Sequence, residues 1–289
     1  MLPRPMQTAI LIIQCKDDKG IVAAVSDFLY RYSGNIIEVD QHIDGEIGDF
    51  FMRAAWELDT FDIPKEEILS VFQYEVGTRF SMLCTLEFSV PKPRMAIFVS
   101  KLSHCLFDVL SRYYSGQFQV EIPLIISNHT DLKRVVKGFG IPFHYIPITK
   151  ETKADQEQRQ LKLLEEHQID FVVLARYMQI LSGEFIRHFP NRIINIHHSF
   201  LPAFVGAKPY HAAYKRGVKI IGATAHYVTE ELDAGPIIEQ DVARVRHQNT
   251  VEEMVQMGQD VEKVVLSRAI KYHLAHKVQV VGNRTIIFT

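Results

Sequence analysis

Cysteine is scarce in this chain of 289 residues, and the few cysteines present share no motif. Cys15, Cys84 and Cys105 are an odd number and lie far apart in the sequence. Structural disulfides persist in oxidising compartments and pair an even number of cysteines, so this usage favours reduced thiols in the core. We therefore expect a cytoplasmic protein without disulfide bonds, and the cysteines do not favour a catalytic thiol.

An excess of charge of one sign is also missing, as is any long apolar run. Lys and Arg number 32 and Asp and Glu number 34, which gives a formal net charge of −2. A broad nucleic-acid surface needs a strong basic excess, and a membrane-spanning helix needs about 20 consecutive apolar residues. The first residues, Met1–Gln7, lack the apolar core of a signal peptide. We therefore expect neither nucleic acid nor a membrane among the partners.

Residues 1–90 predict a small domain with the element order βαββαβ. Short apolar or alternating runs indicate the strands, and apolar residues at helical spacing indicate the helices. The strands are expected at 8–15, 36–43, 50–58 and 81–90, and the helices at 21–32 and 64–76. This order is typical of a ferredoxin-like fold, with both helices on one face of a four-stranded antiparallel sheet.

The start of the first helix resembles the turn of an ACT domain, a small regulatory module that usually pairs edge to edge and binds amino acids. The matching residues are Asp17-Asp-Lys-Gly-Ile21. The resemblance implies that Asp18, Gly20 and Ile21 bind a free amino-acid effector. It also implies a homo-oligomer, a dimer or a tetramer, assembled through the N-terminal sheets. The alternative is that this domain only assembles the oligomer and binds no effector.

Two prolines in Val90-Pro-Lys-Pro-Arg94 cannot continue a strand ladder, so we expect a stiff linker at 91–94. After the linker, strands and helices alternate, which predicts a mostly parallel sheet with helices on both faces. The expected strands are 95–100, 119–126, 142–147, 169–175 and 219–229, and the expected helices are 103–115, 130–138, 153–167 and 209–217. We therefore predict a Rossmann-like α/β domain at 95–289, in which the charged helix 153–167 faces solvent.

Three polar side chains, Asn195, His197 and His198, follow the apolar strand that begins at Arg192. In open α/β sheets the carboxyl ends of strands are where ligands bind. Burying such groups costs free energy unless partners or a ligand satisfy them. We therefore regard this strand end as a candidate site. His226, inside the strand 219–229, is interpreted instead as a structural histidine.

An amide, an imidazole and a carboxylate together suit acyl-group chemistry. Asn195 can donate a hydrogen bond to the oxyanion of a tetrahedral intermediate, and a cationic His197 stabilises it more strongly. Asp233, in the loop before Ala234-Gly-Pro236, would hold the imidazole and help to deprotonate the nucleophile. No Ser or Cys with an adjacent base is apparent, so we expect direct transfer without a covalent intermediate.

A metal site is the alternative interpretation of His197, His198 and Asp233. Adjacent residues on a strand point to opposite faces, so the two histidines are not expected to reach one ion. We therefore predict no metal.

Glycine is missing from the turn at Ser100–Leu106, which follows the first strand of the α/β domain. A phosphate cradle at this turn needs glycines so that backbone N–H groups can approach the anion. The turn therefore argues against a phosphorylated substrate, although Lys101 and the helix start could hold a small anion. A second strand end carries Arg176, Tyr177 and Met178, which suit the wall of a pocket for a flat heteroaromatic ligand as well as simple core packing.

Several motifs resemble the formyltransferase superfamily that uses 10-formyltetrahydrofolate, over roughly residues 94–289. They are Asn195-Ile-His197, Ser199, Leu201-Pro202, Phe204, Gly206 and Leu232-Asp-Ala-Gly235. The longer run His197–His211, the ACT-like domain and the ending Gly282–Ile287 resemble the formyltetrahydrofolate deformylases within that superfamily. Two departures from the transferases are the glycine-free turn at Ser100–Leu106 and His198, where proline is common.

The resemblance implies hydrolysis of 10-formyltetrahydrofolate to tetrahydrofolate and formate. The formate would be used in purine synthesis, and the reaction would balance the one-carbon folate pools. The resemblance makes Asn195, His197 and Asp233 catalytic and implies no cofactor beyond the folate substrate. The residues that it implies in substrate binding are Met178, Gln179, Ile180, Leu181, His198, Ser199, Gly206, Val228, Thr229, Glu230 and Leu232. Two other functions stay open: a formyltransferase to a small amine acceptor, and a non-catalytic sensor of folate or amino acids.

Overall fold

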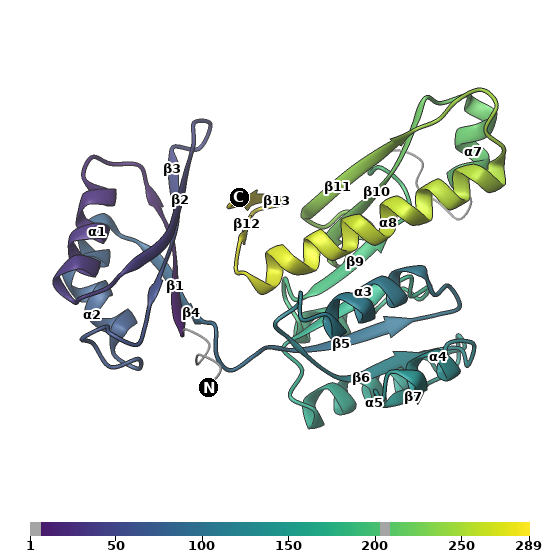
Figure 1. Cartoon of the computed structure of the whole chain (residues 1–289), viewed down its shortest axis with the longest axis horizontal. Coiled ribbons are helices and arrows are strands. Elements are labelled where there is room, and N and C mark those ends of the chain that lie inside the picture. Colours follow the sequence, from purple (N-terminus) through teal and green to yellow (C-terminus); the bar gives the residue numbers. More distant parts are fainter. Residues whose placement is uncertain (1–6, 203–208) are drawn as a thin grey trace. The chain divides into compact units, whose positions relative to one another are not determined.

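The structure, a computed structural model, describes residues 7–202 and 209–289 and divides into two compact units (Figure 1). The first unit comprises the chain up to Lys92 together with Ile286–Thr289, and the second comprises Pro93–Thr285. The last four residues thus belong to the first unit, whereas a domain spanning 95–289 was expected. Among these four residues, the large apolar ring of Phe288 is buried.

The first unit has the predicted βαββαβ order and forms one antiparallel sheet with the strand order β2-β3-β1-β4. Its elements are β1 (Thr8–Lys16), α1 (Ile21–Arg31), β2 (Ile36–Asp44), β3 (Asp49–Glu57), α2 (Ile68–Glu75), the short 3₁₀ helix η1 (Gly77–Phe80) and β4 (Leu83–Phe88). Both α-helices lie on the same side of the sheet (Figure 1). Alternate residues of β1, such as Leu11 and Ile13, form a core there with Phe28 and Phe72. The ferredoxin-like prediction is confirmed.

The second unit is built on a seven-stranded sheet with the order β11-β10-β9-β8-β5-β6-β7. Its strands are β5 (Arg94–Val99), β6 (Glu121–Ser127), β7 (Phe143–Tyr145), β8 (Phe171–Ala175), β9 (Ile193–His197), β10 (Ile220–Tyr227) and β11 (Ile237–Arg244). Strands β5 to β9 pair in parallel, and β10 is antiparallel to both of its neighbours. The mostly parallel α/β prediction is therefore confirmed.

Helices cover both faces of this sheet, which explains why its central strands are apolar throughout. The helices are α3 (His104–Tyr114), α4 (Lys133–Gly138), α5 (Lys153–Glu166), α6 (Gly183–His188), α7 (Pro209–Arg216) and α8 (Val251–Leu274), and a hairpin of β12 (Val278–Val281) and β13 (Arg284–Ile287) follows. Ala96 and Phe98 of β5 pack with Leu164 of α5 and Phe185 of α6. The alternate residue Ile97 is also fully buried, because the opposite face is covered too.

The helix α5 is less solvated than the sequence predicted. Glu157 and Gln160 are buried on it, although polar and charged residues dominate its composition. Glu157 accepts a hydrogen bond from the backbone N–H of Ser182, and Gln160 donates one to the hydroxyl of Tyr177. Such hydrogen bonds compensate for the loss of water, so two polar side chains can be buried at this position.

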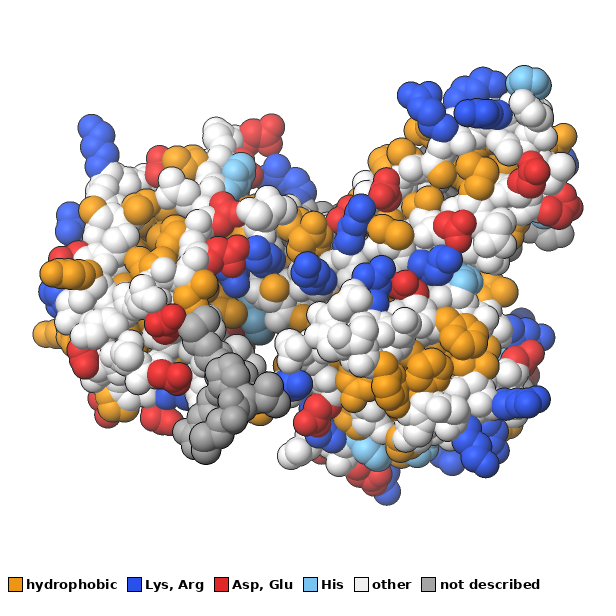
Figure 2. Space-filling model, viewed as in Figure 1, with side chains coloured by type: hydrophobic (Ala, Val, Ile, Leu, Met, Phe, Trp, Pro, Cys, Tyr) orange, Lys and Arg blue, Asp and Glu red, His pale blue; other side chains and the backbone are white. Residues whose placement is uncertain are grey.

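The three cysteines are free thiols, as predicted, and burial raises the pKa of each. Among residues 7–202 and 209–289, no helix combines the length and the apolar character needed to cross a membrane. Acidic and basic side chains are interspersed with apolar ones over the face of the molecule that Figure 2 shows.

The order in which the chain adds strands to the sheet reverses between β5 and β8. Strands β6 and β7 extend the sheet on one side of β5, and β8 and β9 extend it on the other. In open α/β sheets the crevice at such a point, outside the carboxyl ends of the strands, is where ligands bind. Residues that follow β5, β8 and β9 therefore share the edge of the sheet where a site is expected.

The loop between β10 and β11 is held close to its own strand. Tyr227 donates its backbone N–H to the carbonyl of Pro236 at 2.9 Å, and a Cβ atom on Gly235 would overlap the carbonyl oxygen of Tyr227. Backbone atoms cannot move aside as a flexible side chain can. Gly235 is therefore required for the close approach that fixes the position of the preceding Asp233.

We predict that Gly235→Ala destabilises the second unit by about 2 kcal/mol, because overpacking against backbone forces the loop to shift. The midpoint of thermal unfolding should fall by roughly 4–8 °C. Gly138→Ala is the matched control, since a Cβ atom at that position in α4 meets no neighbouring atom. Equal unfolding midpoints for the two variants would show that the loop accommodates the methyl group.

Candidate active site

The pairing of β9 with β10 brings two polar side chains together at the edge of the sheet. In the register of this antiparallel pair, Asn195 lies opposite His226 and His197 lies opposite Thr224. The side-chain amide nitrogen of Asn195 is 3.2 Å from Nε2 of His226. The strand ladder itself therefore positions the amide, independently of any ligand.

The protonation of His226 follows from its neighbours. Its Nδ1 is 2.9 Å from the backbone carbonyl oxygen of Tyr227, which can only accept, so Nδ1 carries the proton. Burial lowers the pKa of His226, although this bond to Tyr227 opposes the shift. The ring is therefore neutral near pH 7, and Nε2 accepts from Asn195. Consequently the 3.8 Å approach of Asp233 to the same Nε2 is not an ion pair.

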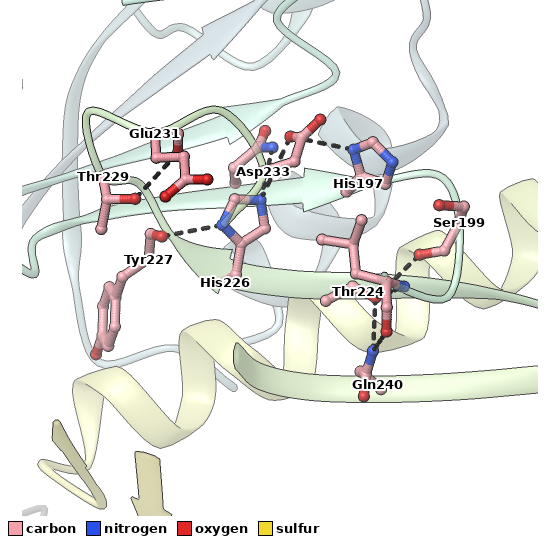
Figure 3. A network of polar contacts seen from close by, with 11 residues as sticks. His197, Ser199, Thr224, His226, Tyr227, Thr229, Glu231, Asp233 and Gln240 are labelled. Atoms are coloured by element: carbon pink, nitrogen blue, oxygen red, sulfur yellow. Dashed lines mark hydrogen bonds and ion pairs between the residues drawn. The ribbon is translucent and has the colours of Figure 1, made fainter. Parts of the chain in front are cut away.

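Asp233 reaches the site from the β10–β11 loop, where its backbone has a φ of 55°. Its Oδ1 is 3.2 Å from Nδ1 of His197 (Figure 3). The hydrogen bond from His197 lowers the pKa of Asp233, and this effect outweighs the opposite effect of burial. Nδ1 of His197 thus donates to a carboxylate, which turns Nε2 toward other partners. Nε2 is buried without a hydrogen-bond partner among the described residues.

A buried hydroxyl anchors the loop that follows His197. Thr224 donates to the carbonyl of Ser199 at 2.9 Å and accepts from the backbone N–H of Leu201 at 3.0 Å. Gln240 donates both to Thr224 and to the carbonyl of Leu201 (Figure 3). These bonds fix the backbone next to the catalytic candidates. Ser199 is buried and is not among the residues that line the cavity described next, so its role in substrate binding stays a prediction.

A cavity of about 380 Å³ opens beside these groups. Its walls combine the catalytic candidates with residues that follow β8 and β10. Of the residues predicted to bind substrate or catalyse, those that line it are Met178, Gln179, Ile180, Leu181, Asn195, His197, His198, Val228, Thr229, Glu230, Leu232 and Asp233. Ser199 is not among the lining residues, and Gly206 lies outside the described residues. Segments far apart in the sequence therefore form one cavity.

Large apolar side chains at this cavity are exposed to solvent. Met178, Ile180 and Leu232 are 57%, 59% and 59% exposed, and all three line the cavity. Exposed apolar residues gathered at one concave surface are typical of a ligand-binding site.

The two adjacent histidines do not point to opposite faces, so that prediction is wrong. Their ring centroids are 5.1 Å apart with an interplanar angle of 31°, and both rings line the cavity. The alternation of a strand no longer applies because β9 ends at His197. Burial, with the nearby charges of Arg176 and His197, lowers the pKa of His198 to about 4. His198 is therefore a neutral group at pH 7.

Sequence reasoning missed two groups at this site. His226 was interpreted as structural, but it contacts both Asn195 and Asp233. The register of β9 against β10 makes this contact, and no sequence motif reports that register. Arg176 was expected in a cavity wall, which it does line, but its buried partner Glu262 was not foreseen. The predicted effector residues Asp18, Gly20 and Ile21 lie at the start of α1 in the first unit.

The arrangement provides two functions that acyl-group hydrolysis needs. Asn195 and Nε2 of His197 supply polar groups next to one cavity, and the Asp233 carboxylate stays ionised to accept a proton. Neither the three cysteines nor Ser199 is among the described residues that line the cavity. The geometry thus favours attack by a small nucleophile from solution over a covalent intermediate.

Comparisons with known proteins agree with this chemistry. A family model described as formyl transferase matches residues 93–270. The formyltetrahydrofolate deformylase of Synechocystis sp. is 53% identical over 281 residues, which cover 97% of this chain and 98% of that protein. The crystal structure of a formyltetrahydrofolate deformylase from Pseudomonas syringae pv. tomato superposes with a TM-score of 0.95 at 46% identity, covering 100% of this chain and 96% of that one.

A second group of similar structures covers a smaller share of this chain. The glycinamide ribonucleotide transformylase 1 of Symbiobacterium toebii superposes with a TM-score of 0.65 at 28% identity, covering 71% of this chain and 98% of that one. The deformylases, by contrast, match both units over nearly their whole length. The chain therefore belongs to the formyltetrahydrofolate deformylase family.

Proposed function

We propose that this chain hydrolyses 10-formyltetrahydrofolate to formate and tetrahydrofolate. Family membership supports the reaction, and one observation carries the assignment of the site. Nε2 of His197 is buried without a partner at the cavity, while Nδ1 is held by the ionised Asp233. An unsatisfied polar atom in such a position costs free energy unless a ligand or water bonds to it.

The folate substrate binds in the cavity between the residues after β8 and the loop after β10. A volume of about 380 Å³ is within the usual range of roughly 300–1,000 Å³ for small-molecule sites. The flat pterin ring packs between apolar side chains such as Ile180 and Leu232, which are otherwise exposed. The formyl group lies toward His197, where the polar groups converge.

Hydrolysis proceeds in two steps in which atoms and charges balance. A water oxygen bonds to the formyl carbon and loses a proton to Asp233, while the carbonyl oxygen becomes an oxyanion. Asn195 and the protonated Nε2 of His197 donate hydrogen bonds to that oxyanion. The intermediate then collapses: the bond between the formyl carbon and N10 breaks, N10 takes the proton held by Asp233, and formic acid leaves and loses its proton to solvent as formate.

His226 makes the amide of Asn195 point in one direction. Because the unprotonated Nε2 of His226 can only accept, Asn195 must present its N–H₂ group there rather than its carbonyl oxygen. The second N–H of the same amide is then available to donate. A donor that is oriented before the reaction need not reorganise as charge develops.

A second proposal concerns the first unit. Strand β2 is an edge strand, and Ile37, Val39 and Ile43 on it are 45%, 42% and 49% exposed. An exposed apolar edge favours pairing with another chain. We therefore propose a homo-oligomer, and a molar mass of one chain by light scattering would exclude it.

We also propose that a free amino acid binds at Asp18, Gly20 and Ile21 and regulates the hydrolysis. Measurements of formate release with and without free amino acids would test this proposal.

We predict formate release from 10-formyltetrahydrofolate without any added amine, and its loss in Asp233→Asn. The neutral amide cannot accept the proton from water, so kcat should fall by about 10²–10⁴-fold, whereas the folate Kd should change little. Asp241→Asn is the matched control, because that carboxylate pairs with Arg268 on the surface. Formate production that depends on an added amine would contradict hydrolysis. Equal rates for wild type and Asp233→Asn would contradict the site.

We predict that His198 of the folded protein is neutral at pH 7. Its depressed pKa of about 4 means that the unfolded chain binds a proton that the folded chain excludes as pH falls from about 6.5 to 4. The free energy of unfolding should therefore decrease by about 1.4 kcal/mol per pH unit for this residue alone. In His198→Asn the unfolding free energy should change less steeply with pH, by an amount that corresponds to the binding of up to one proton. Urea unfolding at several pH values measures this slope.

The acid limb of the kcat/KM profile should be the same in His198→Asn as in wild type. A neutral group that does not titrate in this range cannot generate that limb. A limb that moves when His198 is replaced would instead give this histidine a role in proton transfer.

A further inference from the structure

A cluster of four polar side chains is buried beside the cavity, centred on Glu262 of α8. Glu262 is 1% exposed. Its carboxylate accepts from the hydroxyl of Tyr210 at 3.0 Å, lies 2.7 Å from Nε2 of His104, and lies 3.5 Å from Nε of Arg176. We call these four residues the Glu262 cluster. Its members come from α3, α7, α8 and the segment after β8, so the fold brings together residues distant in sequence.

The Glu262 cluster occupies the crevice at the reversal point of the sheet. His104 opens the helix that follows β5, and Arg176 is the first residue after β8. The same strand ends are linked by hydrogen bonds: Ser100 accepts from the backbone N–H of Met178 at 2.9 Å and donates to Asn128 at 2.7 Å. This crevice is the place where open α/β sheets bind ligands. Here the chain fills it with its own side chains.

His198 connects this cluster with the catalytic candidates. Its ring lies 5.1 Å from that of His197 and 6.3 Å from that of Tyr210, centroid to centroid. Arg176 and His198 both line the cavity that contains Asn195. The cluster is therefore a neighbour of the catalytic candidates.

Two features of the backbone place side chains of the cluster against Glu262. Arg176 has a φ of 63°, a left-handed conformation that is strained for a side chain other than glycine. Gly258 on α8 leaves the space that Tyr210 occupies, because a Cβ atom there would overlap the Tyr210 ring and hydroxyl. Both features cost conformational freedom or strain, and both serve to place a side chain against Glu262.

The charges within the cluster explain why it is not a metal site. His104, Cys105 and Glu262 offer ligand atoms within 4.8 Å of one another. However, Arg176 already places a cation beside Glu262. Burial opposes the charge on Glu262, but the bond from His104 and the charge of Arg176 outweigh it and lower the pKa of the carboxyl. Burial also raises the pKa of Cys105 well above its usual value, which keeps the thiol protonated.

We infer that the Glu262 cluster is a specificity-determining plug, which closes the crevice to amine acceptors and leaves room for water at the formyl carbon. The inference rests on the proposed hydrolysis. The reaction that the plug prevents is formyl transfer: an amine nitrogen bonds to the formyl carbon, the bond to N10 breaks, and N10 takes the proton that the amine loses. The product would be a formamide in place of formate.

The experiment removes the plug without introducing backbone strain. Arg176→Gly deletes the guanidinium at a position whose φ suits glycine. Gln168→Gly is the matched control, since Gln168 has a φ of 48° and precedes β8 on the exposed surface. Each protein is given 10-formyltetrahydrofolate with hydroxylamine or with the larger glycinamide. Formate and the formylated amine are then quantified by mass spectrometry.

We expect the ratio of formylated amine to formate to depend on the size of the acceptor. Wild type and Gln168→Gly should release formate and form little formylglycinamide, whereas Arg176→Gly should raise the ratio of formylglycinamide to formate at least tenfold. The ratio for the smaller hydroxylamine should rise less. If Arg176→Gly does not fold by circular dichroism, His104→Ala, which opens the crevice from α3, carries the same expectation.

Two outcomes would overturn the plug. One is a folded Arg176→Gly variant with the wild-type ratio of products. The other is a folded His104→Ala variant that forms neither product, since His104 does not line the substrate cavity and a group that only excludes acceptors is not needed for hydrolysis. Absence of formate from wild type would instead overturn the proposed function. The two failures are therefore distinguishable in one set of assays.

Discussion

The hydrogen bond between Asp233 and His197 is the interaction on which the site depends. It decides which ring nitrogen of His197 faces the cavity, and it keeps the carboxylate ionised in a half-buried position. The bond exists because a tight loop brings Asp233 back over the end of β9. Gly235 makes this return feasible, since only glycine fits against the carbonyl of Tyr227. Chemistry at one atom thus rests on a steric requirement two residues away.

Two neutral histidine rings lie near the hydrogen bond between Asp233 and His197. His226 and His198 both lie near Asp233, and a proton on either would compete with His197 for the carboxylate. Burial lowers the pKa of each ring, so neither is charged at neutral pH. Neither ring therefore competes with His197 for the hydrogen bond to Asp233. The low polarity of the surroundings contributes to selectivity among histidines, a role that a list of catalytic residues does not reveal.

Much of this architecture could be predicted from the sequence. Apolar periodicity gives both α/β units, and the polar residues after β9 identify the edge of the sheet where the site lies. The pairing of His226 with Asn195 could not be predicted, because it depends on the register of β10, and strand periodicity is the same in either direction. The Glu262 cluster was hidden for a related reason: a glutamate on a long amphipathic helix looks like a solvated residue until its buried partners are known.

The final residues, Ile286–Thr289, have a consequence for dissecting the protein. They belong to the amino-terminal unit although the whole second unit lies between them and Lys92, so the first unit is discontinuous along the chain. A fragment cut after Lys92 would therefore lack part of the first unit. A deletion of Ile286–Thr289 would likewise remove residues of the first unit, although these residues follow the second unit in the sequence.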